Sequence, residues 1–145
     1  MRKYEIVDGR VKALRDFSDV KKGEVGGYVK GEHNLSHEED CWVYGDAKVS
    51  GRAKVYGCAK VYGNADVSEY ADVFGNAEVF GNAVVCGYAV VCGDVKVFGD
   101  AVVSGDADVF GNAKVFGNAV VCGYVKVFGD AVVSGNGHIN RKTST

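Results

Sequence analysis

The three histidines are the side chains of this sequence best suited to chemistry, because a neutral imidazole acts as a general base or binds a metal ion. His33 and His37 lie four residues apart in HNLSH, directly before the acidic run EED, and His138 lies near the C-terminus. Histidines beside carboxylates are candidate zinc ligands. The spacing fixes no third ligand, however, and the neighbouring glycine and asparagine do not favour a helix that would place both histidines on one face. We therefore predict no metal site, no catalytic residue and no cofactor.

A second candidate is a binding site built from residues 1–42, here called the leader. The leader holds the densest mixture of polar and aromatic residue types in the chain, and loops anchored on a rigid scaffold are where binding residues concentrate. The alternative is that the leader only caps the repeats that follow it, since terminal repeats need a cap. The candidate ligand-binding residues are Arg15, Lys22, Tyr28, His33, Asn34, His37 and Trp42.

The elements that would position these residues follow a six-residue repeat. Valine occupies every sixth position from Val43 to Val133, and Ile139 takes the next place. The residue two before each of these positions is small, and the residue two after each valine is glycine, except at Glu69. An unbroken period of this length predicts a repeat architecture. Residues two apart point to the same side of a strand, and glycine tolerates a positive φ, so each hexad is predicted to form one short strand and one turn.

The residue after each valine indicates how many strands close one coil. At a period of 18 these residues separate into three columns, two mainly aromatic and one of small residues. The columns are Tyr44, Tyr62, Phe80, Phe98 and Phe116, then Tyr56, Phe74, Cys92, Phe110 and Phe128, then Ser50, Ser68, Cys86, Ser104 and Cys122. Three strands per coil predict a triangular prism in which like side chains stack about 4.8 Å apart.

This pattern resembles that of the hexapeptide-repeat proteins, whose fold is a left-handed parallel β-helix. The stretch from Ala13 to Ala47 resembles more specifically a group of uncharacterised proteins, common in bacteriophage genomes and often labelled putative transferases. The left hand of the coil is implied by the resemblance alone, because parallel crossovers are usually right-handed. The expected fold class is therefore all-β, a left-handed parallel β-helix with three strands and 18 residues per coil, about five coils, and a small N-terminal β cap.

The chain is predicted to divide into the leader (1–42), the β-helix (43–139) and a C-terminal tail (140–145). Within the leader, KYEIV, DG and RVKALRDF indicate a strand, a tight turn and a second strand, which is a β-hairpin. The stretch GGYVKGEHNLS is predicted to form an irregular first coil, with Val25, Val29 and Leu35 facing inward.

Composition narrows the classes of function. The chain has 145 residues, 47% of them hydrophobic, which suits one repeat domain with a cap. Its formal net charge of −2 provides no basic surface for nucleic acid. No charged-then-apolar leader and no long apolar run occur, so we expect neither secretion nor membrane insertion. The five cysteines are expected to be free, small apolar fillers, which suits a reducing cytoplasm, that of the host if the chain is phage-encoded.

The predicted surface favours self-association. Two aromatic ladders and one flat, apolar face expose more apolar surface than a monomer usually does. We expect a homo-oligomer, a dimer or a trimer, formed through one face. The candidate interface residues are Val84, Val102, Val120, Phe80, Phe98 and Phe116.

Three functions remain open at this point. The preferred one is a non-catalytic, homo-oligomeric binding protein, which in a phage setting would sequester a nucleotide-like host signalling ligand or block a host protein. The second, implied by the resemblance, is an acyltransferase that uses His33, His37 or His138 with a CoA donor. The third is a purely structural rod.

The binding hypothesis assigns chemistry to two kinds of side chain. Aromatic side chains would stack against a base, and basic side chains would hold a phosphate. The basic candidates are Arg15, Lys21, Lys22, Arg52 and Lys54.

Overall fold

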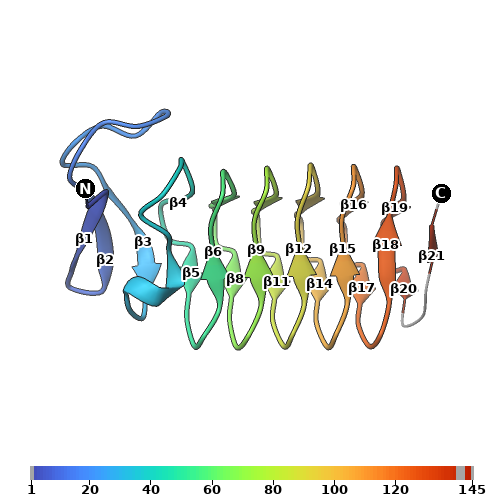
Figure 1. The fold of residues 1–145 in the computed structure, drawn as a ribbon. Helices are drawn as coiled ribbons and strands as arrows, with labels where there is room; N and C mark the ends of the chain where they lie inside the picture. Colours follow the sequence, from blue (N-terminus) through green and yellow to red (C-terminus); the bar gives the residue numbers. More distant parts are fainter. Residues whose placement is uncertain (1, 140–142, 145) are drawn as a thin grey trace.

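The structure, a computed structural model, describes residues 2–139 and 143–144. Short parallel strands recur every six residues and stack into a β-solenoid of about six coils, with about 18 residues per turn (Figure 1). The described residues contain no α-helix and a single short 3-10 helix, η1 (Glu32–Asn34). The predicted all-β fold class is confirmed, and the solenoid is consistent with the left-handed β-helix that the resemblance implies.

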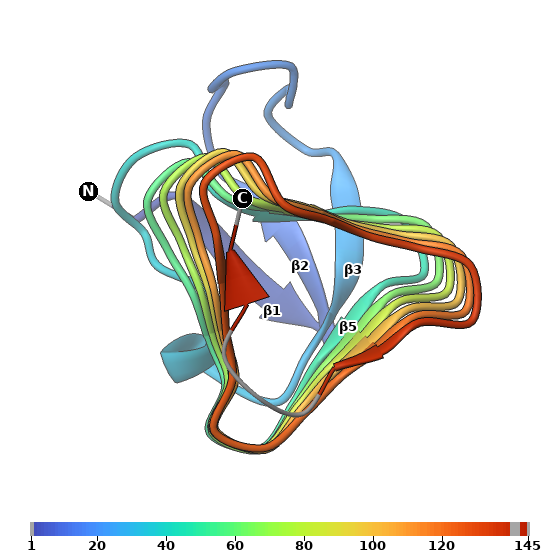
Figure 2. The same cartoon turned by 90° about the vertical axis from the view of Figure 1, so that its right-hand side faces the viewer.

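Three sheets form the sides of a prism whose cross-section is triangular (Figure 2). The first sheet has the order β1 (Tyr4–Val7), β2 (Arg10–Ala13), β3 (Val25–Val29), β5 (Lys48–Val49), β8 (Asp66–Val67), β11 (Val84–Val85), β14 (Val102–Val103), β17 (Val120–Val121) and β20 (His138–Ile139). The second has the order β4 (Trp42–Val43), β7 (Lys60–Val61), β10 (Glu78–Val79), β13 (Lys96–Val97), β16 (Lys114–Val115) and β19 (Val132–Val133). The third has the order β6 (Lys54–Val55), β9 (Asp72–Val73), β12 (Val90–Val91), β15 (Asp108–Val109), β18 (Lys126–Phe128) and β21 (Thr143–Ser144).

The core of the prism consists of the repeated valines and the small residues two before them. Every hexad valine from Val43 to Val133 is buried, as predicted, and Ile139 is partly buried. The register is 18 residues, so that Val85 pairs with Val103 and Val103 with Val121. Because identical side chains lie above one another, each coil buries the apolar edge of the next.

The turns between strands depend on backbone with a positive φ. Gly87 is one of the glycines that occupy this position, with φ 68°, and its backbone runs close to that of Gly105 in the next coil. Glu69 breaks the glycine series and still adopts φ 61°. Its carboxylate accepts a hydrogen bond from the backbone nitrogen of Gly87 at 2.7 Å, which helps to offset the strain of a side chain at this position.

The leader forms the predicted hairpin and adds a coil to the solenoid. Strands β1 and β2 pair antiparallel around the turn at Asp8 and Gly9, both with positive φ. Strand β3 then pairs antiparallel with β2 and parallel with β5, and Leu35 forms a bridge with Val55. This irregular coil helps to explain why about six coils are present rather than the predicted five.

The inward residues of this first coil were predicted with one error. Val29 and Leu35 are buried, but 53% of Val25 is exposed. Val25 pairs with Lys12 at the edge where β3 leaves the hairpin, ahead of the residues that pair with β5. In the tail predicted for 140–145, Thr143–Ser144 pairs with β18, and residues 140–142 and 145 lie outside the described part of the chain.

Candidate functional site

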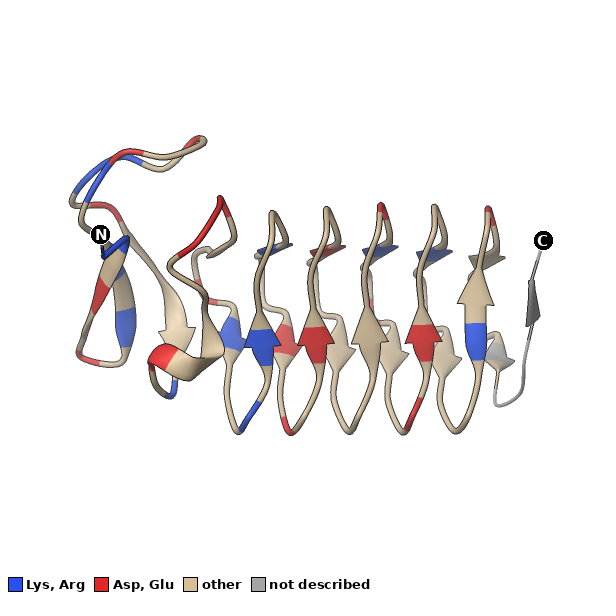
Figure 3. Ribbon diagram, viewed as in Figure 1, with Lys and Arg blue, Asp and Glu red and all other residues tan. Residues whose placement is uncertain are grey.

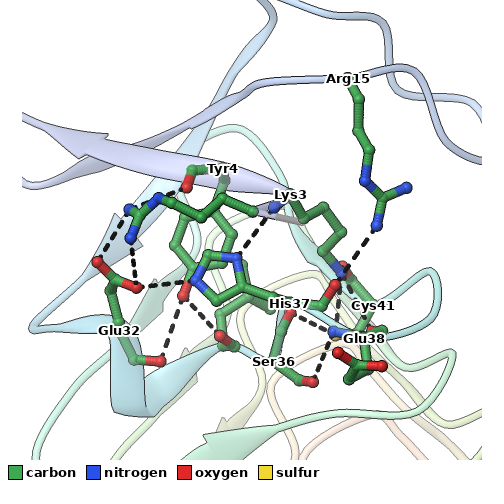
Figure 4. Close-up of polar contacts among 10 residues, drawn as sticks. Lys3, Tyr4, Arg15, Glu32, Ser36, His37, Glu38 and Cys41 are labelled. Carbon is green, nitrogen blue, oxygen red and sulfur yellow. Dashed lines mark hydrogen bonds and ion pairs between the residues drawn. The ribbon is translucent and has the colours of Figure 1, made fainter.

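His37, a predicted site residue, is held inside a polar network of the cap (Figure 4). Its Nδ1 accepts a hydrogen bond from the backbone nitrogen of Lys3 at 3.1 Å, so its Nε2 carries the proton that it donates to Glu32 Oε1 at 2.8 Å. The imidazole also stacks on the ring of Tyr4, with centroids 4.1 Å apart. Both ring nitrogens are thus engaged, which leaves no lone pair free for a general base.

Glu32 and Tyr4 complete this network. Hydrogen bonds, first from His37 and then from Arg2, lower the pKa of the Glu32 carboxyl. The Tyr4 hydroxyl donates to the carbonyl of Leu35 at 2.5 Å, and burial raises its pKa. These contacts join β1 to the segment around η1, so the network holds the hairpin onto the first coil.

A buried lysine and a buried thiol lie at the centre of the cap. Lys3 Nζ donates to the carbonyl of Cys41 at 2.6 Å and to that of Glu39 at 3.2 Å, and it lies 3.4 Å from Cys41 Sγ. Burial lowers the pKa of Lys3 and raises that of Cys41, so both shifts favour the neutral forms. The pair ties the N-terminus to the chain 38 residues later.

Two other predicted site residues are buried and shape the cap. Asn34 accepts hydrogen bonds from the backbone nitrogens of Lys30 and Gly31 and donates to the carbonyl of Ala53 at 2.8 Å. Trp42 is fully buried, and its Nε1 has no hydrogen-bond partner. Neither side chain reaches the surface, where a ligand would meet it.

The remaining leader candidates lie at separate places. The Arg15 guanidinium donates to the carbonyl of His37 at 3.4 Å. Lys22 is exposed on the loop after β2, and the Tyr28 ring lies under the guanidinium of Arg10, 4.5 Å from its centroid. Of the predicted leader residues, His33 alone lines the groove described next.

That groove, of about 650 Å³, follows the corner between the first and third sheets. We call it the corner groove. Its lining residues are His33, Arg52, Lys54, Tyr70, Asp72 and Tyr88. The segments that supply them are the loop at η1, three successive turns of the corner, and strands β6 and β9.

Stacked side chains form one wall of the corner groove. The guanidinium of Arg52 lies over the ring of Tyr70, 5.8 Å from its centroid, and Tyr70 stacks on Tyr88 with centroids 4.9 Å apart. Tyr70 is 48% exposed and Tyr88 is 61% exposed, both high values for aromatic side chains. The wall therefore offers aromatic surface to a ligand.

The opposite side of the groove carries charge. Lys54 and Asp72 are neighbours on the third sheet (Figure 3), where burial raises the pKa of Asp72 and the nearby Lys54 opposes the shift. Within residues 2–139, neither the Arg52 guanidinium nor the Lys54 ammonium makes a hydrogen bond or an ion pair. His33 donates from Nε2 to the carbonyl of Gly51 at 2.8 Å, which leaves its Nδ1 free to accept when the ring is neutral. The groove is thus basic with one acidic group.

A pattern in the sequence pointed to this groove, but the predicted binding site in the leader was not based on that pattern. Arg52, Tyr70 and Tyr88 follow one another at intervals of 18 residues in the turns of one corner, and Arg52 and Lys54 were already candidates for holding phosphate. The approach of His33 to this corner depends on the path of the leader, which no periodicity predicts.

The candidate interface residues lie as two ladders on different faces. Val84, Val102 and Val120 pair in register along the first sheet and are half-buried. Phe80, Phe98 and Phe116 stack along the second sheet with centroids 4.9 Å apart. The two ladders share no face, so a single planar contact with a second chain would cover only one of them.

Among the described residues, no group of three or more His, Cys, Asp or Glu side chains able to hold a metal ion occurs. The side chain of His138, a candidate base, lies outside the described part of the structure. In the same described part, no helix is both long and apolar enough to cross a membrane.

The comparisons with known proteins identify no family. No protein-family model matches the chain, and no curated protein is significantly similar to it.

Proposed function

We propose that this chain is a non-catalytic binding protein that holds a small anionic ligand with an aromatic ring in the corner groove. The observation that carries the proposal is the pair of basic side chains, Arg52 and Lys54, that lie without a hydrogen-bonding partner beside stacked tyrosines. Guanidinium and ammonium groups together bind phosphate, because the first forms paired hydrogen bonds and the second adds a compact charge.

A nucleotide-like ligand fits this combination of groups. Its phosphate would meet Arg52 and Lys54, and its ring would lie against the tyrosine wall, since stacking on aromatic side chains stabilises any base. Asp72 lies beside Lys54 and partly offsets the attraction of that lysine for phosphate.

The resemblance to phage-encoded hexapeptide-repeat proteins supplies a biological setting for the proposal. A protein that binds a nucleotide and does not transform it would act by sequestration, and here the ligand would be a host signalling nucleotide in the host cytoplasm. We further propose that the protein is a homo-oligomer, because the half-buried valine ladder of the first sheet is apolar along three successive coils.

The acyltransferase alternative is less well supported. Such an enzyme needs a histidine whose free nitrogen reaches the acceptor. His37 has both nitrogens engaged, and His33 lies in the corner groove without a carboxylate that would orient it. A structural rod would explain the stacked aromatic residues but would not require beside them Arg52 and Lys54, whose side chains make no hydrogen bond or ion pair within residues 2–139.

Calorimetric titration with a panel of nucleoside phosphates tests the proposal. The double variant Arg52→Ala/Lys54→Ala should weaken binding by at least about tenfold, because it removes both phosphate contacts. Lys114→Ala, an exposed lysine on the second sheet, is the matched control and should leave binding unchanged. The proposal is wrong if no nucleotide binds, or if the control weakens binding as much as the double variant.

A further inference from the structure

The corner that forms the tyrosine wall continues beyond Tyr88, and there its ladder is interrupted. The successive residues at this corner are Arg52, Tyr70, Tyr88, Asp106 and Tyr124. Asp106 is half-buried, and its side chain makes no hydrogen bond or ion pair with the described residues. Tyr124 is 86% exposed, the highest exposure among the large apolar and aromatic side chains described.

The exposed fraction of each tyrosine at this corner depends on how many faces of its ring are covered by a neighbouring side chain. Tyr70 has Arg52 on one face and Tyr88 on the other, whereas only one face of Tyr88 meets another aromatic ring. No described aromatic ring stacks on Tyr124. The face of Tyr88 that points toward Tyr124 is therefore not covered by a described aromatic ring.

Because Asp106 stands where an aromatic residue would continue the ladder, the spacing of the coils sets the distance between the rings of Tyr88 and Tyr124. The stacked rings of this protein that lie one coil apart have centroids separated by 4.7 to 5.3 Å. Tyr88 and Tyr124 are two coils apart, which places them about 10 Å from one another. A planar ring inserted between them would lie one ordinary stacking distance from each tyrosine.

We propose that the gap between Tyr88 and Tyr124 is a slot for a nucleobase, with Asp106 at its floor. The inward edge of an inserted ring meets the Asp106 carboxylate, which only accepts hydrogen bonds. A guanine edge fits it, because its ring N–H and its amino group both donate and form a paired contact with a carboxylate. Uracil does not fit, since its single ring N–H is flanked by two carbonyl oxygens that the carboxylate repels.

The slot would bind the base of the ligand that we propose for the corner groove. The inference rests on the proposed function for the position of the phosphate. Asp106 lies three coils from Arg52 along the same corner, about 14 Å away. A guanine nucleotide with an extended phosphate chain has the shape to place its base in the slot and its phosphate at Arg52. This separation also keeps the phosphate away from Asp106 and from Asp108, which pairs with Lys126 at 3.5 Å.

The test uses two probes on the whole protein, guanosine for the slot and inorganic pyrophosphate for the corner groove. Asp106→Tyr supplies the missing rung and fills the slot, and tyrosine already occupies this position in three other coils. It should weaken guanosine binding by at least about tenfold and leave pyrophosphate binding unchanged. Asp106→Ala keeps the slot open and removes its acceptor, and it should also weaken guanosine binding, by about tenfold.

The matched control fills a different gap. Cys92 interrupts the aromatic ladder of the third sheet between Phe74 and Phe110, so Cys92→Phe completes that ladder and should leave guanosine binding intact. The slot is disproved if the unmodified protein does not bind guanosine, if Asp106→Tyr leaves guanosine binding unchanged in a normally melting protein, or if Cys92→Phe weakens it equally. Guanosine binding without pyrophosphate binding would support the slot and overturn the anion site in the corner groove.

Discussion

Gly105 lies so close to Gly123 in the next coil that a Cβ on Gly105 would stand 2.6 Å from the backbone nitrogen of Gly123. Both the positive φ of Gly105, 66°, and this contact disfavour a side chain at the turn. The glycine repeat therefore has two physical causes, one within each turn and one between coils. They can be separated by substitution.

Gly105→Ala should destabilise the protein more than Gly45→Ala. Gly45 also has a positive φ, 58°, but a Cβ there meets nothing within 4 Å, so alanine pays only the left-handed backbone cost of about 1–2 kcal/mol. At Gly105 the backbone of the neighbouring coil must also move, which adds about 1–3 kcal/mol. Chemical denaturation of both variants measures the difference. Equal losses would show that crowding between coils contributes nothing.

The solenoid was predictable because each residue's environment repeats. A valine such as Val85 has the same neighbours one coil before and one coil after it, so the six-residue period alone indicates burial and the 18-residue columns indicate register. The error at Val25 falls where the repeat has not yet begun. There, burial depends on the antiparallel pairing with β2, which a local pattern does not contain.

The candidate site was less predictable, because its contacts join residues that are far apart in the sequence and follow no repeat. The contacts that partly bury His37 come from Lys3 and Tyr4, more than thirty residues earlier in the chain. Charge and residue type suggested a functional role for His37, and the structure shows that His37 also contacts β1 within the cap. The Tyr70 and Tyr88 wall was visible as a column, but its exposure became known only from the structure.

His37→Ala and His33→Ala should differ in their effect on stability. His37→Ala leaves the backbone nitrogen of Lys3 without its acceptor and removes the ring stacked on Tyr4, and we expect a loss of about 1–3 kcal/mol. His33 is exposed and makes one hydrogen bond, so His33→Ala should cost about 0.5–1 kcal/mol. Thermal melting followed by circular dichroism compares the two. A His37→Ala variant that melts like the unmodified protein would contradict the structural role of His37.

Glu32 should make the cap sensitive to acid. Hydrogen bonds from His37 and Arg2 lower its pKa in the folded state below the ordinary value of 4.5, so the folded protein favours the charged carboxylate. The stabilisation is complete above about pH 4.5 and is lost as the pH falls through the lower, folded-state pKa. Glu32→Gln should therefore melt at a lower temperature than the unmodified protein at pH 7, and the difference should shrink below pH 4.5. A difference independent of pH would mean that the charge of Glu32 is irrelevant.

Val102→Lys should dissociate the proposed homo-oligomer without unfolding the chain. Val102 lies at the centre of the valine ladder on the first sheet, and a lysine buried there in an interface would leave an unpaired charge that costs several kcal/mol. The fold should tolerate the change, because Lys48 occupies an equivalent outward position in the same sheet. Val132→Lys, at a 58% exposed valine of the second sheet, is the matched control. Light scattering should show an oligomer for the unmodified protein and for Val132→Lys, and a monomer for Val102→Lys. If Val102→Lys stays oligomeric and Val132→Lys dissociates, the interface lies on the second sheet. If the unmodified protein is a monomer at high concentration, the proposed self-association is wrong.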